Sequence, residues 1–271
     1  MKKYVLILVA VCILGIPFTA FAEAEWKQNF ASPSYGLVIF PSRIERNWIQ
    51  GVDSGLEEQS FLTPAVDLRI FRGVNVSRRG GFYSGVEAGA LIFVPMSQSF
   101  TDSVTIHTFQ AGDVTFSDFN FNLEVNGGIV FLMAKYGLRI DIGPALFGLG
   151  LGADLGMGAS LYSGGFELYA GDRDEGVSTS WGASGASMGL IVNSGVEGAL
   201  RLGRNFRFFA NAGVIIVPVS YPNNQTWEEN QWVLDDQNPS PRDLQRYALS
   251  NYNVNIDAFG FGARFGFVLN Y

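Results

Sequence analysis

Apolar and polar residues alternate strictly along the last thirteen residues of the chain, 259–271. Every second side chain is apolar, and five of these are aromatic rings, whereas the positions between them carry three glycines, Arg264, Val268 and Asn270. A period of two places successive side chains on opposite faces of a β-strand. A face of rings opposite a face rich in glycine predicts a membrane-spanning strand, with lipid outside and a crowded interior.

Similar alternation along the rest of the chain predicts seven further strands. The fifth of them changes phase near Phe147, just after Pro144, and we interpret this change as a β-bulge in one long strand. We therefore expect eight strands. Ten strands are the alternative, if residues 126–128 and the change of phase are turns instead. The seven ranges are 35–40, 60–71, 81–94, 116–133, 138–161, 188–202 and 206–218.

The expected connections alternate between short and long. Short turns carry basic residues and no acid, whereas the long connections are acidic. Three short periplasmic turns alternating with four long outer loops are typical of a closed antiparallel up-and-down transmembrane β-barrel, which leaves no unpaired strand edge in lipid. The short connections are 73–80, 134–137 and 203–205, and the long ones are 41–59, 95–115, 162–185 and 219–250.

The end of the chain also carries a family resemblance. Arg264-x-Gly266-x-x-Leu269-x-Tyr271 resembles the C-terminal signal of bacterial outer-membrane β-barrels, and the whole pattern resembles the small OmpA/OmpX/OmpW-like eight-stranded barrels. The resemblance implies that the barrel-assembly machinery recognises Arg264, Gly266, Leu269 and Tyr271 in the last strand. It also implies a location in the outer membrane, with outer-membrane lipids as partners.

The start of the chain predicts export. Lys2 and Lys3 precede an apolar run, and Ala20-Phe21-Ala22 has the small residues of a cleavage site, so residues 1–22 are expected to be a cleaved signal peptide. A permanent anchor helix is the alternative. Residues 23–271 would then form the barrel domain. Cys12 is the one cysteine and lies in the signal segment, which excludes disulfides from the mature chain.

The charge balance excludes one class of partner. After loss of Lys2 and Lys3, 16 basic residues oppose 25 acidic residues, and 16 − 25 gives a net charge of −9. Such a chain is not suited to bind nucleic acid. We expect no cofactor.

The alternation directs a set of charged side chains to the interior. Near-equal numbers of both signs in a narrow lumen should pair into a network that blocks a pore. The candidates are Asp67, Arg69, Glu87, Glu124, Arg139, Asp141, Asp154, Glu197, Arg201, Arg207 and Arg264.

Three functions are compatible with this pattern. The favoured one is a structural or surface-interaction protein that acts through its long acidic loops, in which Trp227 and Trp232 are candidate adhesive contacts. A narrow channel or carrier for small solutes is the alternative. An outer-membrane enzyme using His107 is a remote third, because no G-x-S-x-G nucleophile motif accompanies this histidine. The segment 171–176 offers oxygen ligands for Ca²⁺, but its spacing fits no EF-hand and favours a solvated acidic loop.

Overall fold

The structure is a computed structural model and describes residues 29–75, 82–142, 147–171, 176–201, 206–219 and 223–270. These residues form an 11-stranded antiparallel sheet, one α-helix and one 3-10 helix. The expected signal peptide 1–22, residues 172–175 of the acidic loop and Tyr271 lie outside the described residues. The strands are β1 (Asn29–Arg46), β2 (Val52–Ser54), β3 (Glu58–Asn75), β4 (Phe82–Phe93), β5 (Met96–Thr108), β6 (Gly112–Ile142), β7 (Phe147–Ala170), β8 (Val177–Arg201), β9 (Phe206–Ile216), β10 (Tyr252–Ile256) and β11 (Phe259–Asn270); the helices are η1 (Gln231–Leu234) and α2 (Pro241–Ser250).

Strand pairing closes on itself. Starting from β1, antiparallel pairs follow the order β3, β4, β6, β7, β8, β9 and β11, and β11 pairs again with β1. The three further strands lie off this ring: β2 and β5 continue the sheet beside β6, and β10 pairs with β1. Backbone groups of the ring strands therefore find partners on both sides over much of their length.

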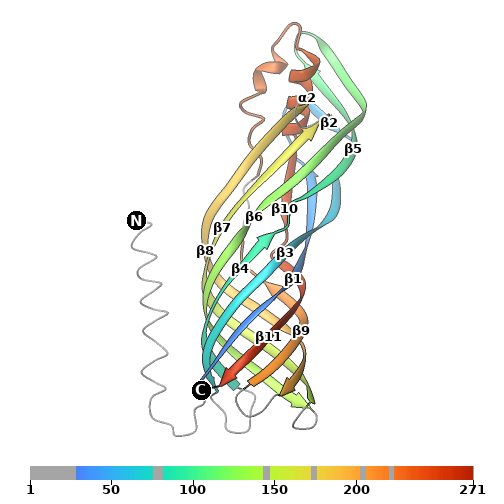
Figure 1. The fold of residues 1–271 in the computed structure, drawn as a ribbon. Helices are drawn as coiled ribbons and strands as arrows, with labels where there is room; N and C mark the ends of the chain where they lie inside the picture. The colour runs from blue at the N-terminus through green and yellow to red at the C-terminus, as the bar shows by residue number, and fades with distance from the viewer. Residues whose placement is uncertain are drawn as a thin grey trace, which may run out of the picture.

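The sheet forms a tall, inclined cylinder with two different ends (Figure 1). At one end, here called the turn end, lie the strand ends Asn75, Ile142, Arg201 and Asn270. At the other end, the lobe end, the strands continue into a folded lobe that contains β2, β5, β10, η1 and α2. We define the lobe as residues 47–57, 96–125, 163–171, 176–184 and 223–256.

The outward face of the cylinder is apolar between the turn end and the lobe. Along β11, Phe261, Phe265, Phe267 and Leu269 are exposed, whereas Arg264, Gly266 and Val268 are buried, as the sequence predicts. The same apolar outward face continues on each of the other seven strands of the ring. We call this surface the belt; it includes Tyr35, Leu37, Leu62, Leu68, Ile70, Ile92, Val130, Leu132, Leu155, Met157, Met188, Leu190, Val196, Phe208, Phe261, Phe265 and Phe267.

Three predictions about turns and bulges are wrong. Residues 134–137 are not a turn, because Ala134–Gly137 lie within β6 and pair with both β4 and β7. Residues 126–128, the turn of the ten-stranded alternative, also lie within β6, where Gly127 has φ +115°, a conformation that favours glycine. The bulged strand 138–161 is wrong too, since Leu138–Ile142 end β6 and pair antiparallel with Leu149–Ala153 of β7. At this point the ten-stranded alternative, which ended one strand at the change of phase and began another, is confirmed. Residues 143–146, with Pro144, lie outside the described residues.

The face assignment of residues 116–133 is also wrong. The aromatic and aliphatic residues at odd positions of β6, including Phe119, Phe121, Leu123 and Phe131, are buried rather than in contact with lipid. Asn120 and Asn122 lie on the outer surface, where they bond Thr101 and Ser99 of β5 at 2.6 Å. Period two separates two faces but does not say which face is inside when the interior is itself apolar.

The long connections are folded, contrary to the expectation of loops. Their buried side chains join one apolar core that continues into the cylinder, and α2 contributes Leu244, Tyr247, Ala248 and Leu249 to it. Ser240 caps α2, accepting a hydrogen bond from the Asp243 amide at 3.2 Å, and Pro241 occupies its first turn. No helix in the described part of the chain is long and apolar enough to cross a membrane.

Candidate functional site: the interior charge layer

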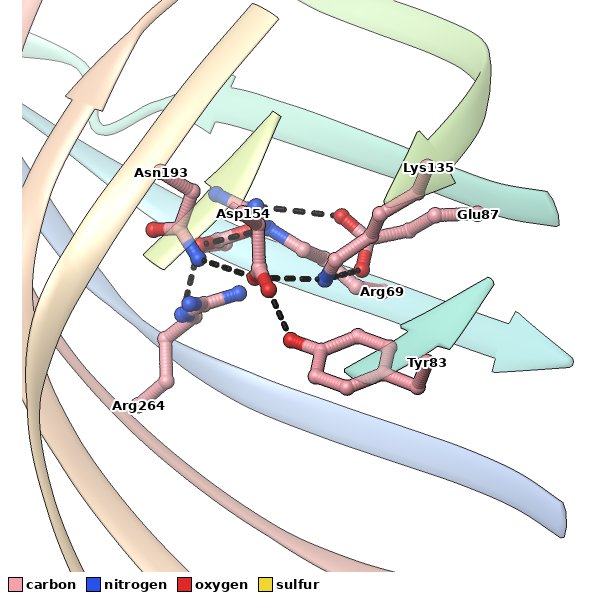
Figure 2. A network of polar contacts seen from close by, with 8 residues as sticks. Arg69, Tyr83, Glu87, Lys135, Asp154, Asn193 and Arg264 are labelled. Atoms are coloured by element: carbon pink, nitrogen blue, oxygen red, sulfur yellow. Dashed lines mark hydrogen bonds and ion pairs between the residues drawn. The ribbon is translucent and has the colours of Figure 1, made fainter. Parts of the chain in front are cut away.

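Charged side chains from seven strands converge inside the cylinder, and Figure 2 shows the part of this group around Lys135 and Asp154. Asp67 and Arg69 are two residues apart on β3, so both side chains point to the same face. Arg69 lies between two carboxylates: its Nε is 2.7 Å from Asp67 Oδ1, and its Nη1 is 3.2 Å from Glu87 Oε1 on β4. The ring centroid of Phe131 lies 5.3 Å from the guanidinium carbon.

Lys135 on β6 is the second cation of this group. Its Nζ lies 2.6 Å from Glu87 Oε2 and 2.8 Å from Asp154 Oδ2 on β7. Asp154 also accepts hydrogen bonds from Tyr83 and from Asn193 Nδ2, the latter at 2.9 Å. Lys135 therefore links two buried carboxylates that belong to strands on either side of its own.

Two further arginines complete the group. Arg207 Nη2 of β9 lies 2.5 Å from Glu197 Oε1 of β8, and Arg264 Nε of β11 lies 3.9 Å from Asp67 Oδ2. The described members are thus four acids and four bases, whose formal charges cancel. We call these eight residues the charge layer: Asp67, Arg69, Glu87, Lys135, Asp154, Glu197, Arg207 and Arg264.

Apolar side chains lie on both sides of the charge layer. Toward the turn end, Phe30, Phe71, Ala199, Phe209 and Val268 form a small cluster, with Tyr83 packed against it. Toward the lobe, the interior belongs to the main core. There Val38, Phe40, Leu91, Phe93, Ile129, Phe131, Ile191 and Ile215 are all buried. The charge layer is therefore enclosed between two apolar layers.

The space left beside the charge layer is small. A cavity of about 50 Å³ is lined by Glu87, Lys135, Asp154, Asn211 and Arg264, among others. Since one water needs roughly 10–15 Å³ by this measure, the cavity can hold a few waters and no larger solute. A second space of about 10 Å³ lies beside Arg69 and Arg264. Chemically, the arrangement can pair charges and hold water.

The sequence candidates divide into three groups. Asp67, Arg69, Glu87, Asp154, Glu197, Arg207 and Arg264 lie in the charge layer. Glu124 does not: its neighbours Leu123 and Val125 are buried, and Glu124 lies on the outer face, across from Ser97 of β5 and Glu167 of β7. The side chains of Arg139, Asp141 and Arg201 lie outside the described part of the structure.

Sequence reasoning missed Lys135 because Lys-Tyr-Gly resembles a turn. A usable pattern was present: Val130, Leu132, Tyr136 and Leu138 are apolar at even positions, and all four are exposed in the structure. Continuing that alternation through residue 135 places Lys135 on the opposite, inward face. Of the expected assembly motif, Arg264 and Gly266 lie on the inward face of β11, Leu269 lies on the outward face, and Tyr271 is outside the described residues.

His107 lies far from the charge layer, on the outer surface of the lobe. Its Nδ1 is 2.9 Å from Asp113 Oδ1 of β6, and its Nε2 is 2.9 Å from Asp53 Oδ2 of β2. These two hydrogen bonds raise the pKa of His107 above its ordinary value. Of the hydroxyls near His107 in sequence, Thr105 pairs with Thr115, and Thr108 donates to the Gly112 carbonyl.

A buried carboxylate links three segments of the lobe through hydrogen bonds. Asp102 of β5 accepts hydrogen bonds from the Leu56 amide at 2.8 Å, from the Ser54 hydroxyl and from the Tyr252 hydroxyl at 2.5 Å. The Tyr252 ring stacks on Phe121 with 4.4 Å between centroids. Burial, followed by the bond to Asp102, raises the pKa of Tyr252, so its hydroxyl stays protonated.

Comparisons with known proteins give no family. No protein-family model matches the chain, and neither does any curated protein. Among solved structures, the chain is similar to the outer membrane protease OmpT from Escherichia coli, with 9% identity, 93% of this chain and 100% of that chain covered, and a TM-score of 0.41. It is also similar to Ail, the attachment invasion locus protein of Yersinia pestis, in complex with the heparin analogue sucrose octasulfate, with 11% identity, coverage of 90% and 99%, and a TM-score of 0.31.

Proposed function

We propose that the chain is an outer-membrane protein whose eight ring strands form a closed and plugged transmembrane barrel, and that the lobe acts outside the cell in surface interactions. The supporting observation is the inversion of polarity between the two faces: apolar residues cover the outside of the cylinder while four acids and four bases are buried inside it. A water-soluble domain shows the opposite arrangement.

The height of the belt suits a bilayer. On β11 the exposed apolar residues run from Phe261 to Leu269, and on β6 from Val130 to Leu138, which is nine residues in each strand. A transmembrane β-strand needs roughly 9–11 residues at the usual tilt. Above the belt the outward face becomes polar, as Ser99, Thr101 and Asn122 show on β5 and β6. This change supports a membrane boundary between the cylinder and the lobe.

The interior supports a plugged lumen rather than a channel. An ion or solute crossing the cylinder would have to disrupt the charge layer and then pass the apolar layer that contains Leu91, Phe93 and Phe131. Separating a buried ion pair leaves uncompensated charges in a medium of low dielectric constant, which is costly. The small cavity beside Lys135 and Asp154 is the one observation that favours the alternative, a narrow channel.

The lobe supports a role in surface interactions. Twelve acidic residues oppose two arginines, Arg242 and Arg246, in the lobe as defined above. The acids are Asp53, Glu57, Asp102, Asp113, Asp118, Glu124, Glu167, Glu228, Glu229, Asp235, Asp236 and Asp243. A folded lobe of one sign of charge attracts partners of the other sign over several ångströms.

We propose no catalytic role for His107, since both of its ring nitrogens contact carboxylates on the lobe surface. The closer relationship to the OmpA, OmpX and OmpW barrels, the cleavage after residue 22 and recognition by the assembly machinery stay predictions.

Conductance and surface labelling test the proposal together. The full chain is purified, inserted into planar bilayers and recorded at high salt, where a plugged barrel gives no discrete current steps. In parallel, an epitope tag placed between Glu228 and Glu229 is expected to be labelled by antibody on intact cells. A tag placed between Asn270 and Tyr271 is expected to be labelled only after the outer membrane is opened. Reproducible current steps would support the channel, and a chain released in the soluble fraction would contradict the membrane assignment.

A further inference from the structure

Three aromatic side chains are exposed in the lobe. Trp48 follows β1 and is 90% exposed, Phe109 follows β5 and is 65% exposed, and Trp232 of η1 is 49% exposed. All three lie outside the belt, so a bilayer around the cylinder does not cover them. We call them the tip patch.

The turns that carry the tip patch are joined by backbone hydrogen bonds. The Phe109 amide donates to the Leu234 carbonyl at 2.8 Å, which places the end of β5 beside η1. The His107 amide donates to the Gly51 carbonyl at 2.7 Å, and Gly51 also lies against the Leu234 side chain. Gly51, residues 107–109 and Leu234, which are distant in sequence, therefore meet in one place; Trp48 lies three residues before Gly51, and Trp232 lies two residues before Leu234.

The surroundings of the tip patch are acidic. Asp235 and Asp236 directly follow η1, Asp53 and Asp113 flank His107, and Glu228 lies in the segment before η1. The lobe as defined carries two arginines against twelve acids; both arginines belong to α2, and Arg46 at the end of β1 is a further cation beside Trp48. An aromatic surface within a negative field suits a cationic partner, because the face of an aromatic ring attracts ammonium and guanidinium groups.

The structure already contains one such contact. The guanidinium carbon of Arg46 lies 4.3 Å from the centroid of the Trp48 ring. Trp48 nevertheless keeps 90% of its surface exposed, so a single arginine leaves most of the ring open. The contact is one example, within the chain, of a guanidinium group packed against an aromatic ring of this surface.

We propose that the tip patch binds a lysine- and arginine-rich segment of a partner protein, with Trp48, Phe109 and Trp232 as its contacts and the surrounding acids as its electrostatic support. This inference rests on the proposed function and adds the class of partner to it. A second copy of the chain is disfavoured as the occupant, because two lobes with twelve acids each repel one another. The same charge disfavours an anionic lipid surface.

Binding of a defined basic peptide tests the inference. The purified full chain in detergent is titrated with fluorescent decalysine and decaarginine, with decaglutamate as the control of opposite charge. The basic peptides are expected to bind at low salt and to weaken steeply as salt rises, since screening shortens electrostatic attraction to about 8 Å at physiological ionic strength. Absence of binding by the unmodified chain at low salt would overturn the inference.

Variants distinguish binding by the aromatic residues of the tip patch from attraction by the net negative charge of the lobe. Trp48→Ala combined with Phe109→Ala and Trp232→Ala is expected to weaken binding of decaarginine by about tenfold or more, as loss of aromatic contacts at interfaces commonly does. Ser99→Ala with Thr101→Ala, on the outer surface of β5, serves as the matched control and should bind normally. Equal affinity of the triple variant and the control would show that the net charge alone attracts the peptide, and the inference would be wrong.

Folding and membrane insertion are measured on the same samples. Retention of β-sheet circular dichroism by the triple variant excludes unfolding as the cause of lost binding, and Phe109→Ser alone provides a milder change with the same expected direction. Failure of this inference can be distinguished from failure of the proposed function. A barrel that is inserted and non-conducting, yet binds no basic peptide, overturns only this inference.

Discussion

Lys135 Nζ lies 2.8 Å from Asp154 Oδ2 across the pair of strands β6 and β7, although Lys135 faces Gly156 in the register of the sheet. The lysine reaches past that glycine, where the sulfur of Met133 already lies 2.5 Å from the position a Cβ would take. A long cationic side chain beside a residue without a side chain can thus contact carboxylates on both neighbouring strands. This relationship makes Lys135 the central cation of the charge layer.

Replacing Lys135 by methionine should destabilise the barrel strongly. The change leaves Glu87 and Asp154 buried without their shared cation, and breaking a buried ion pair by removal of one partner typically costs about 3–5 kcal/mol. The free energy of unfolding, measured with urea in lipid vesicles, should fall by that order.

A double variant provides the control for this prediction. Adding Glu87→Gln to Lys135→Met removes one of the two carboxylates that lose this cation, so the two changes together should cost less than the sum of the separate costs, by about 0.5–3 kcal/mol. Additive costs, or a Lys135→Met variant as stable as the unmodified chain, would show that the contacts with Glu87 and Asp154 contribute little.

His107 should titrate above its ordinary pKa. The chain has one histidine, so its proton resonance is assigned without ambiguity. Hydrogen bonds to Asp53 and Asp113 raise the pKa of His107, and Asp113→Asn should lower it again. Because the folded pKa is the higher one, the added stability is fully present below the unfolded pKa of about 6.5 and is lost as pH rises through the folded value. A pKa at or below 6.5 in the folded chain would contradict these contacts in solution.

The cost of an arginine on the outward face of β8 should depend on whether it lies in the belt or in the lobe. Val196 and Ser180 both lie on this face, Val196 within the belt and Ser180 in the lobe. Val196→Arg should lower the free energy of unfolding by about 2–4 kcal/mol, the cost of an arginine near the bilayer midplane. Ser180→Arg, the matched control, should change it by less than about 0.5 kcal/mol, as surface substitutions usually do. Urea unfolding in lipid vesicles measures both, and similar costs at the two sites would contradict the placement of the belt.

The sequence pattern predicted the outward face of a strand best where the opposite face carries glycines or charged residues. On β11 the side chains of Phe261, Phe265 and Phe267 lie on the face opposite Arg264 and the glycines, and in the proposed barrel only the phenylalanine face is suited to lipid. On β6 the same rule failed, because Phe121 and Leu123 fill an apolar core while Asn120 and Asn122 meet water above the belt. Composition alone does not distinguish lipid from protein as the surroundings of a phenylalanine.

The sequence pattern predicted loops where the folded lobe lies, although the start of one of its helices could have been predicted. Ser240-Pro241-Arg242-Asp243 has a capping residue, a proline at the first helical position and an acid in the first turn, which together predict the start of α2. The contact between Asp102 and Tyr252 was not readable, since 150 residues separate the two and no local pattern links them.

Removing the Tyr252 hydroxyl should loosen the lobe without affecting the belt. Tyr252→Phe keeps the ring that stacks on Phe121 but deletes a 2.5 Å hydrogen bond to the Asp102 carboxylate, and bonds to charged groups contribute about 1.5–3 kcal/mol. Amide hydrogen exchange should accelerate in residues 52–56 and 252–256, which Asp102 holds together, while β11 keeps its protection. Tyr247→Phe is the matched control: its hydroxyl donates to the neutral Gln50 carbonyl at 3.0 Å, so its loss should cost only about 0.5–1.5 kcal/mol. If both variants exchanged at the same rate, the charge on Asp102 would not strengthen this bond, and the lobe would depend on its apolar core alone.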